Sequence, residues 1–268
     1  VNTTTVTLTC FDNEAINTMI SDVMCLSPRL TRSLSEIIYH KSGGNPLFFS
    51  QLMLSLNRDG LVKFSLSRRR WTWDEEQIQS TKLPDDVATF LSCSIQRLPT
   101  EVREALFTLA CFGASSDCFL ISSLEDKLGS PLIAPLDIAV TAGLLDKINS
   151  TYRFGHDWLQ EAAYHTVIEP NRPILHFRYG VLLVPSAIDF KDDNMLFTAA
   201  HQINMGGPAA VKDAEQSVLV ANLNLTASLK AMEMSDFVSA HSFADHGITF
   251  LRKGHWKDHY DLSLRLFE

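Results

Sequence analysis

The residues that follow Pro170 constrain the fold most, because apolar side chains recur in them only at the spacing of α-helices. We predict helices at about 172–184, 193–205, 212–232, 236–253 and from 256 onward. The last three are long and are joined by short turns, which favours antiparallel helix pairs. We therefore expect a helical, TPR-like or α-solenoid arm over 169–268. It would contain only about one to one and a half repeats, too few to establish a period.

The segment before this arm combines helices with a small β-hairpin. Helical spacing predicts four helices, at about 85–97, 100–112, 117–128 and 133–142. Two strand-like runs, 144–148 and 152–154, then flank the turn Asn149-Ser150-Thr151, and a further helix reaches about Ile168. Helices that are closed by a hairpin and followed by another helix are typical of a winged-helix domain, which we expect over 84–168.

The N-terminal part is predicted to hold a strand and three helices. The β-branched, alternating run 3–11 predicts the strand. Asp12 is a suitable N-cap for the helix that follows it. The second helix is expected at about 30–40, and the third ends near Asn57 after a glycine-rich turn.

A second hairpin is predicted in the connecting segment 61–83. The residues expected to share a face are Val62, Phe64 and Leu66 on the first strand, and Trp71 and Trp73 on the return strand. The stretch KLPDD, residues 82–86, is the clearest boundary in the chain. The sequence thus divides into 1–60, 61–83, 84–168 and 169–268.

The glycine-rich turn is KSGGNP, which ends in Gly44-Asn45-Pro46 directly before an apolar helix. Such a turn can hold phosphate. The chain nevertheless contains no GxxxxGK[ST], and no Lys-Ser/Thr pair follows the glycines, so this turn cannot act as a P-loop. GxGxxG, GxSxG, HExxH and a metal-ligand spacing of His and Cys are also absent. We therefore name no catalytic residue and expect no metal site.

The charge pattern argues against a nucleic-acid partner. The chain has 23 basic and 31 acidic residues, for a formal charge of -8. The stretch RRRWTW combines phosphate-binding and base-stacking residue types, but it also fits a hairpin turn with solvated arginines. The segment 133–142, which could enter a DNA groove, has no Lys or Arg, and 117–128 has one Lys against three acids.

The remaining composition bears on compartment. No apolar run approaches the roughly 18 residues of a membrane span, so we expect none. The five cysteines are odd in number, form no CxxC pair, and several lie in apolar surroundings, as buried reduced thiols do. These features favour a reducing, cytoplasmic location.

The stretch YRFGHDWLQEAAY is the most informative in the chain. The residues that form one broad apolar arc on its helix are Phe154, Trp158, Leu159, Ala162, Ala163 and Val167. His156 falls at the edge of this arc in the first turn, where it could meet a phosphate beside free backbone N–H groups. It could equally be packed and hydrogen-bonded locally. Asp157 is well placed for the helix N-terminus.

Taken in order, several motifs resemble one known family. They are GGNPLFFSQLMLSL, RRWTWD, IQRLP, AGLL, YRFGHDWLQEAAY and the helical tail. Their order is similar to that in the Orc1-like AAA segment of large sensor kinases, which belongs to the STAND class of signalling ATPases. The resemblance implies a mainly α fold: the end of an ATPase core with its helical lid over 1–60, a winged-helix domain with small β-hairpins over 84–168, and then the helical arm.

The resemblance also implies site residues. The family's Gly-x-Pro lid motif matches Gly44-Asn45-Pro46, in which the proline lies against the adenine side of the nucleotide. The family's His-Asp signature matches His156-Asp157, in which the histidine senses the diphosphate and holds the closed, inactive state. We therefore expect ATP or ADP as the ligand of the intact protein, bound in part by these five residues.

The family's P-loop, magnesium-binding acid and first sensor are not in this chain, and we expect them upstream of Val1 in the same polypeptide. The expected function is regulatory: the nucleotide state would be coupled to a helical sensor or scaffold arm, which would bind protein partners within a larger sensor kinase. The alternative is a helical protein-interaction module that does not depend on nucleotide. A DNA-binding winged-helix regulator is disfavoured by the acidic charge.

Overall fold

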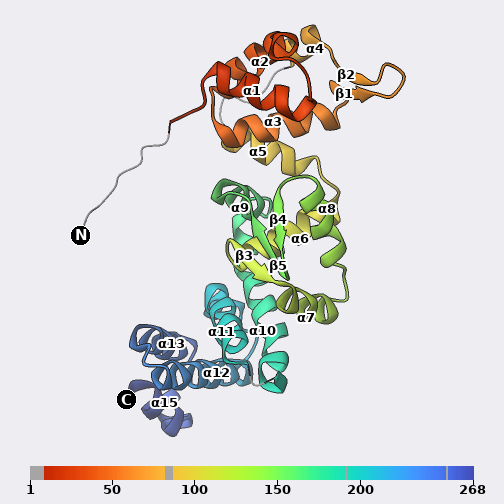
Figure 1. Ribbon diagram of the computed structural model, residues 1–268. Coiled ribbons are helices and arrows are strands. Elements are labelled where there is room, and N and C mark those ends of the chain that lie inside the picture. Colours follow the sequence, from red (N-terminus) through yellow and green to blue (C-terminus); the bar gives the residue numbers. More distant parts are fainter. Residues whose placement is uncertain (1–8, 82–86, 191, 252) are drawn as a thin grey trace, which may run out of the picture. The chain divides into compact units, whose positions relative to one another are not determined.

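The computed structural model describes residues 9–81, 87–190, 192–251 and 253–268, and helices predominate among them (Figure 1). The chain forms two compact units. The first comprises Val1–Leu98 with Ala142–Leu144, and the second comprises Pro99–Thr141 with Leu145–Glu268. The predicted mainly α class with small antiparallel hairpins is confirmed. The sequence predicted a finer division into four segments. The division into two units does not test it, so it stays a prediction.

The first unit is a small helical body with one hairpin. Its elements are α1 (Asn13–Met24), α2 (Pro28–Ser42), α3 (Pro46–Arg58), β1 (Val62–Ser65), β2 (Arg70–Trp73), α4 (Glu75–Ser80) and α5 (Val87–Gln96). Asp12 caps α1 as predicted, because its carboxylate accepts a hydrogen bond from the Ala15 N–H at 2.8 Å. Most of the predicted strand 3–11 lies outside the described residues, and residues 9–11 have no regular structure.

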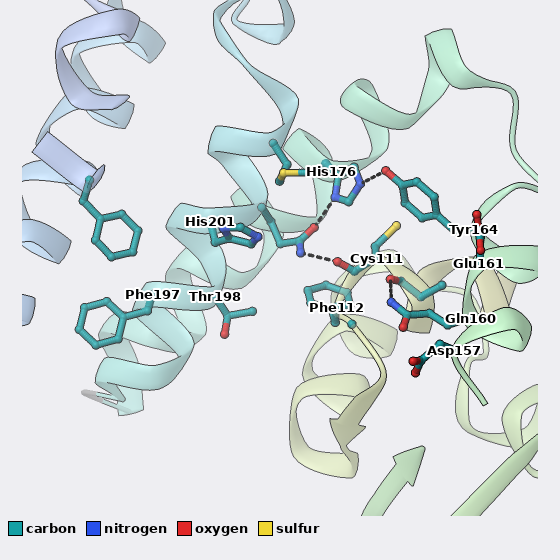
Figure 2. A pocket seen from close by; sticks show the side chains of 15 residues that line it. Cys111, Phe112, Asp157, Gln160, Glu161, Tyr164, His176, Phe197, Thr198 and His201 are labelled. Atoms are coloured by element: carbon teal, nitrogen blue, oxygen red, sulfur yellow. Dashed lines mark hydrogen bonds between the residues drawn. The ribbon is translucent and has the colours of Figure 1, made fainter. Parts of the chain in front are cut away.

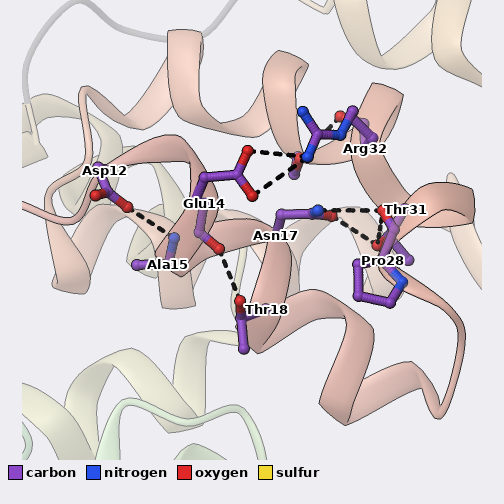
Figure 3. Close-up of polar contacts among 9 residues, drawn as sticks. Asp12, Glu14, Ala15, Asn17, Thr18, Pro28, Thr31 and Arg32 are labelled. Carbon is purple, nitrogen blue, oxygen red and sulfur yellow. Dashed lines mark hydrogen bonds and ion pairs between the residues drawn. The ribbon is translucent and has the colours of Figure 1, made fainter.

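A buried polar pair joins α1 to α2 (Figure 3). The Thr31 hydroxyl donates to Asn17 Oδ1 at 2.7 Å, and Asn17 Nδ2 donates to the Pro28 carbonyl at 3.1 Å. Both side chains are almost completely buried, so each would cost free energy without its partner. The exposed ion pair between Arg32 and Glu14, at 2.9 Å, adds little. The buried pair therefore sets the packing of the two helices.

The predicted hairpin of the first unit forms, with a shorter first strand than expected. Val62 pairs with Trp73 and Phe64 with Trp71, so these residues share a face as predicted. Leu66 lies beyond β1 and is 85% exposed, so it does not join that face. The predicted boundary at 82–86 lies outside the described residues.

The second unit begins with helices around a three-stranded antiparallel sheet. The elements are α6 (Thr100–Cys111), β3 (Ser115–Asp117), α7 (Cys118–Leu128), α8 (Ile133–Thr141), β4 (Leu145–Ile148), β5 (Thr151–Phe154) and α9 (Asp157–Tyr164). The strand order is β3-β5-β4. The predicted hairpin is β4-β5, whereas β3 was not predicted, because its three polar residues carry no strand signal and it exists only through pairing with β5.

The sheet is held to α8 by one buried tyrosine. Tyr152 on β5 is fully buried, and its hydroxyl donates to Asp137 Oδ1 on α8 at 2.8 Å. Lys147 on β4 donates to the same carboxylate, also at 2.8 Å. These hydrogen bonds hold the pKa of Asp137 below its usual range, with the bond from Lys147 contributing most. The hairpin is therefore anchored at its centre.

The rest of the second unit is helical, as predicted. Its elements are a 3₁₀ turn (Glu169–Asn171), α10 (Arg172–Phe190), α11 (Asp193–Gly206), a 3₁₀ turn (Pro208–Ala210), α12 (Ala214–Glu233), α13 (Phe237–Phe250), α14 (His255–Asp258) and α15 (Tyr260–Phe267). Expected to end near 184, α10 continues past Pro185. Ala187 packs beyond it against Met195 and Leu196 of α11, which offsets the hydrogen bond that proline removes.

Glycines allow α10 and α11 to approach closely. A Cβ atom at Gly180 would lie 2.7 Å from the Ala199 carbonyl oxygen and 2.6 Å from Ile203 Cγ1. A Cβ atom at Gly206 would lie 2.5 Å from Phe177 Cβ. All three distances are far inside van der Waals contact, so neither position accepts a larger residue without moving a helix. Figure 1 shows α10 and α11 side by side.

We expect Gly180→Ala to destabilise the second unit by about 1–3 kcal/mol through overpacking. Alanine normally favours a helix over glycine by about 1 kcal/mol, so the sign of the effect is diagnostic. The measurement is the urea midpoint of unfolding, followed by circular dichroism. Val181→Ala, at a more exposed neighbouring position, serves as control and should change stability by less than about 0.5 kcal/mol. A stabilised Gly180→Ala variant would contradict the close packing.

Candidate functional site

The glycine turn connects α2 to α3 in the way that the residues predict. Gly43 ends α2 in the left-handed conformation, and its N–H donates to the Tyr39 carbonyl at 2.8 Å. Asn45 is the N-cap of α3, and its side chain accepts from the Phe48 N–H at 3.0 Å. Pro46 is the first residue of α3, where a missing N–H costs nothing. The motif is therefore well explained as a helix-to-helix connection.

Gly44 leaves less room for a side chain than the neighbouring Gly43 does. Its φ is +75°, and an added Cβ atom would collide with the Phe11 carbonyl oxygen. The Phe11 N–H in turn donates to the Gly44 carbonyl at 2.8 Å. By contrast, an added Cβ atom at Gly43 would meet nothing within 4 Å. Pro46 is exposed, and its contact with an adenine ring stays a prediction.

The His-Asp motif lies at the start of α9. His156 is the N-cap of this helix and not part of its first turn: its Nδ1 accepts from the Trp158 N–H at 3.1 Å. The His156 side chain is exposed, and Trp158, expected in the buried arc, is 42% exposed. The helix buries Leu159, Ala162 and Ala163. The other two residues expected in the arc are not on this helix: Phe154 belongs to β5, and Val167 follows the end of α9 at Tyr164. Asp157 occupies the helix N-terminus as predicted.

The two predicted motifs belong to different units. Gly44, Asn45 and Pro46 lie in the first, and His156 and Asp157 lie in the second. A nucleotide site that uses both motifs therefore stays a prediction.

Asp157 also lines a groove in the second unit that the sequence did not predict (Figure 2). The groove has a volume of about 820 Å³. Its lining residues come from α6 and the residues after it, α9, α10, α11 and α13. They are Ala110, Cys111, Phe112, Gly113, Asp157, Gln160, Glu161, Tyr164, His176, Phe197, Thr198, His201, Gln202, Met205 and Phe243.

A chain of hydrogen bonds crosses the base of this groove (Figure 2). Tyr164 Oη lies 2.9 Å from His176 Nε2, and His176 Nδ1 lies 2.7 Å from Gln202 Oε1. Gln202 Nε2 donates to the Cys111 carbonyl at 2.8 Å. His176 is 3% exposed and Gln202 is 1% exposed, so these bonds replace lost contacts with water. The chain joins α9, α10, α11 and α6.

The geometry assigns the positions of the protons in this chain of hydrogen bonds. Because the Gln202 amide nitrogen donates to Cys111, its oxygen must accept, and His176 Nδ1 therefore carries a hydrogen. Burial lowers the pKa of His176, which keeps the ring neutral. Neutral Nε2 is then an acceptor, so the Tyr164 hydroxyl donates to it. Burial also raises the pKa of Tyr164, in keeping with a donor hydroxyl.

The groove contains one thiol, that of Cys111, and its pKa is strongly shifted. Burial raises the pKa of the Cys111 thiol to about 12, so the thiolate that would act as a nucleophile is not formed near neutral pH. In the described part of the chain, no three His, Cys, Asp or Glu side chains gather as metal ligands. The expectation of several buried cysteines is wrong: Cys111 is buried, but Cys10, Cys25 and Cys93 are exposed.

Sequence reasoning missed this groove for a physical reason. Gln160 and Tyr164 are one helical turn apart on α9, so their shared face could have been recognised. His176 and Gln202, however, are 26 positions apart, and the Cys111 carbonyl is a further 91 positions from Gln202. No spacing rule links such residues; only helix packing brings them together.

None of the described helices is long and apolar enough to cross a membrane.

We expect Gly44→Ala to destabilise the first unit by more than Gly43→Ala. Both residues have positive φ, so each substitution costs about 1–2 kcal/mol of backbone strain. Only Gly44→Ala adds the collision with Phe11, for a total of roughly 3 kcal/mol or more. Urea unfolding of the two variants, followed by tryptophan fluorescence, measures the difference. Equal losses would show that the contact with Phe11 is unimportant.

We expect the second unit to lose stability as the pH falls below about 6.5. The folded pKa of His176 is lowered, so the unfolded chain takes up the proton first. The contribution of neutral His176 to the stability is therefore complete above the pKa that this residue has in the unfolded chain. It is lost as the pH falls toward the lower pKa of the folded state, by up to about 1.4 kcal/mol per pH unit. Urea midpoints between pH 7.5 and 5.5 measure this slope. His176→Gln, which cannot titrate, should lack it; an unchanged slope in that variant would exclude His176 as the source.

The comparisons with known proteins give one relative. An alignment 318 residues long covers 96% of this chain and relates it to hybrid signal transduction histidine kinase G of Dictyostelium discoideum. The two sequences are 23% identical over this alignment. The chain spans only 9% of the length of that relative. No protein-family model matches the sequence, and no solved structure matches it.

Proposed function

We propose that this chain is the regulatory portion of an ATP-dependent signalling module and couples the nucleotide state to its helical arm. Its similarity to a signal transduction histidine kinase supports a role in signalling. The order of its motifs, which resembles that of STAND-class ATPases, supports the link to nucleotide. The P-loop domain would be another part of the same polypeptide, in a cytoplasmic sensor kinase.

The exposed edge of His156 carries this proposal. Its Nδ1 is used to cap α9, whereas among the described residues no group bonds to Nε2. That nitrogen lies beside the N-terminus of an eight-residue helix, where the backbone dipole favours an anion. At this helix N-terminus His156 would meet a phosphate group through Nε2, beside the exposed carboxylate of Asp157. On the first unit, Pro46 is exposed and fits a packing contact with a base.

The topology of the second unit supports the winged-helix part of the proposal. The three helices and three strands follow one another in the order α6-β3-α7-α8-β4-β5, so that two helices separate the first strand from the hairpin. Strand β5 lies at the centre of the sheet, between β3 and β4. We interpret this as the winged helix that would cover a bound nucleotide. A DNA-reading role has no support, since α8 carries no Lys or Arg.

The buried hydrogen-bond chain supplies a route from His156 to the arm. Tyr164, at the end of α9, bonds to His176 on α10, which bonds to Gln202 on α11. A displacement of α9 by ligand at its N-terminus would therefore disturb both arm helices. Such a ligand acts by favouring one of two arrangements of α9 on the arm helices. It shifts the equilibrium between these arrangements only as far as its affinities for them differ.

We expect His156→Ala to release ADP roughly tenfold faster or more from the intact protein, because a hydrogen bond to a charged group is lost. His156→Asn is the matched control for the helix cap, since asparagine caps helices well but has no Nε2. Stopped-flow release of a fluorescent ADP analogue measures the rate. If His156→Asn retains ADP like the natural protein while His156→Ala does not, His156 acts only as a cap and the sensor role fails.

A second candidate function is a helical protein-interaction module that does not depend on nucleotide. The groove between α9, α11 and α13 favours it, because it combines apolar and charged side chains and holds no activated nucleophile. Calorimetry of the intact protein with ADP separates the two candidates: absence of ADP binding would leave only the interaction module.

A further inference from the structure

The groove of the second unit has walls of different chemistry (Figure 2). One wall is α9, which contributes the carboxylates of Asp157 and Glu161. The other wall comes from α11 and α13 and is mostly apolar, with Phe197, Met205 and Phe243 beside the polar Thr198 and His201. None of the described lining residues is a lysine or an arginine. The lining residues therefore carry a net negative charge beside an apolar surface, and the nearby cation is Arg172, whose guanidinium lies 4.8 Å from the centre of the Tyr164 ring.

The two carboxylates lack a permanent cationic partner. Among the described residues, Asp157 forms no ion pair, and Glu161 faces only the His165 ring at 3.8 Å. Both members of that pair are more than half exposed, so the contact adds little. Asp157 and Glu161 are one helical turn apart, so they can face one bound cationic segment together.

The apolar wall offers anchoring points for a ligand. The rings of Phe197 and Phe243 stack with their centroids 5.7 Å apart, which holds both in place. Met205 is 49% exposed, although it is flexible and apolar. Because Met205, His201 and both acids remain open to solvent, the groove would not enclose a small molecule on most sides as small-molecule sites do. It better suits a chain segment that lies along it.

We propose that this groove binds a basic, apolar peptide segment of a partner protein. Lysine or arginine side chains of the segment would lie against Asp157 and Glu161, and leucine or aromatic side chains would pack against Phe197, Met205 and Phe243. Complementary charge gives such a site its partner preference and its speed of association, and the aromatic anchors give it affinity. The proposal does not rest on nucleotide binding.

The test uses a fluorescein-labelled amphipathic peptide of about 15 residues, with leucine and phenylalanine at helical spacing and arginine and lysine between them. Fluorescence anisotropy with the 268-residue chain, without nucleotide, measures the affinity. We expect saturable binding that weakens as salt rises. The same peptide with glutamate in place of each basic residue should not bind.

Three variants locate the site. We expect Glu161→Gln to weaken binding roughly threefold and to reduce its salt dependence, and Phe243→Ala to weaken it roughly tenfold. Glu215→Gln, which removes an exposed acid of α12 outside the groove, should bind like the natural chain. Because Phe243→Ala could disturb packing, its circular dichroism is compared with the natural spectrum, and Glu161→Gln stands as the independent test.

The proposal is overturned if no saturable binding occurs up to about 1 mM peptide. It is equally overturned if the acidic peptide binds as well as the basic one, or if Glu161→Gln and Glu215→Gln behave alike. Because the assay contains no nucleotide and leaves His156 unchanged, its failure is distinct from failure of the sensor role.

Discussion

The close crossing of α10 and α11 is the constraint on which the second unit depends. Gly180 and Gly206 let the backbones approach, because either Cβ atom would collide with the opposite helix. This approach places His176 opposite Gln202 and buries both. The amide of Gln202 then reaches back to the carbonyl of Cys111, so the same crossing joins the arm to α6. Both ring nitrogens of His176 and both amide atoms of Gln202 have a hydrogen-bond partner, as their burial requires.

The groove follows from the same packing. Its base is the hydrogen-bond chain, and its walls are the flanking surfaces of α9 on one side and of α11 and α13 on the other. A neutral His176 and a protonated Cys111 make the base uncharged, so the charge of the groove lies on its rim at Asp157 and Glu161. In the proposed complex with a basic peptide, the acidic rim would meet the basic side chains and the uncharged base would lie beneath them.

The two motifs of the predicted nucleotide site have strong structural roles of their own. Asn45 and His156 are both N-caps, and Gly44 leaves room for the backbone of Phe11. Helix starts have free N–H groups, so a cap and a phosphate contact demand similar residues. The residue types at these positions therefore cannot separate the two roles. His156 differs from Asn45 in that its ring has a second nitrogen, which the cap does not use.

The sequence predicted local features well where one or two residues decide them. Asp12 identified the start of α1, and the alternation of Val62, Phe64, Trp71 and Trp73 identified a hairpin. Prediction from the sequence failed where tertiary contacts decide the local structure. Strand β3, for example, consists of three polar residues that become a strand only by pairing with β5. Likewise, α10 continues through Pro185 because packing on α11 offsets the lost hydrogen bond.

The sequence by itself determined the mainly helical class, the two hairpins, the N-cap Asp12 and the absence of a P-loop in this chain. These depend on periodicity and on side chains that act within a few residues of their own position. Only the tertiary structure decided that Trp158 is partly exposed, that His176 is buried and neutral, and that a groove lies between α9 and the arm. Those properties depend on which distant segments meet, and burial, pKa and cavity shape are set by that packing and not by local spacing.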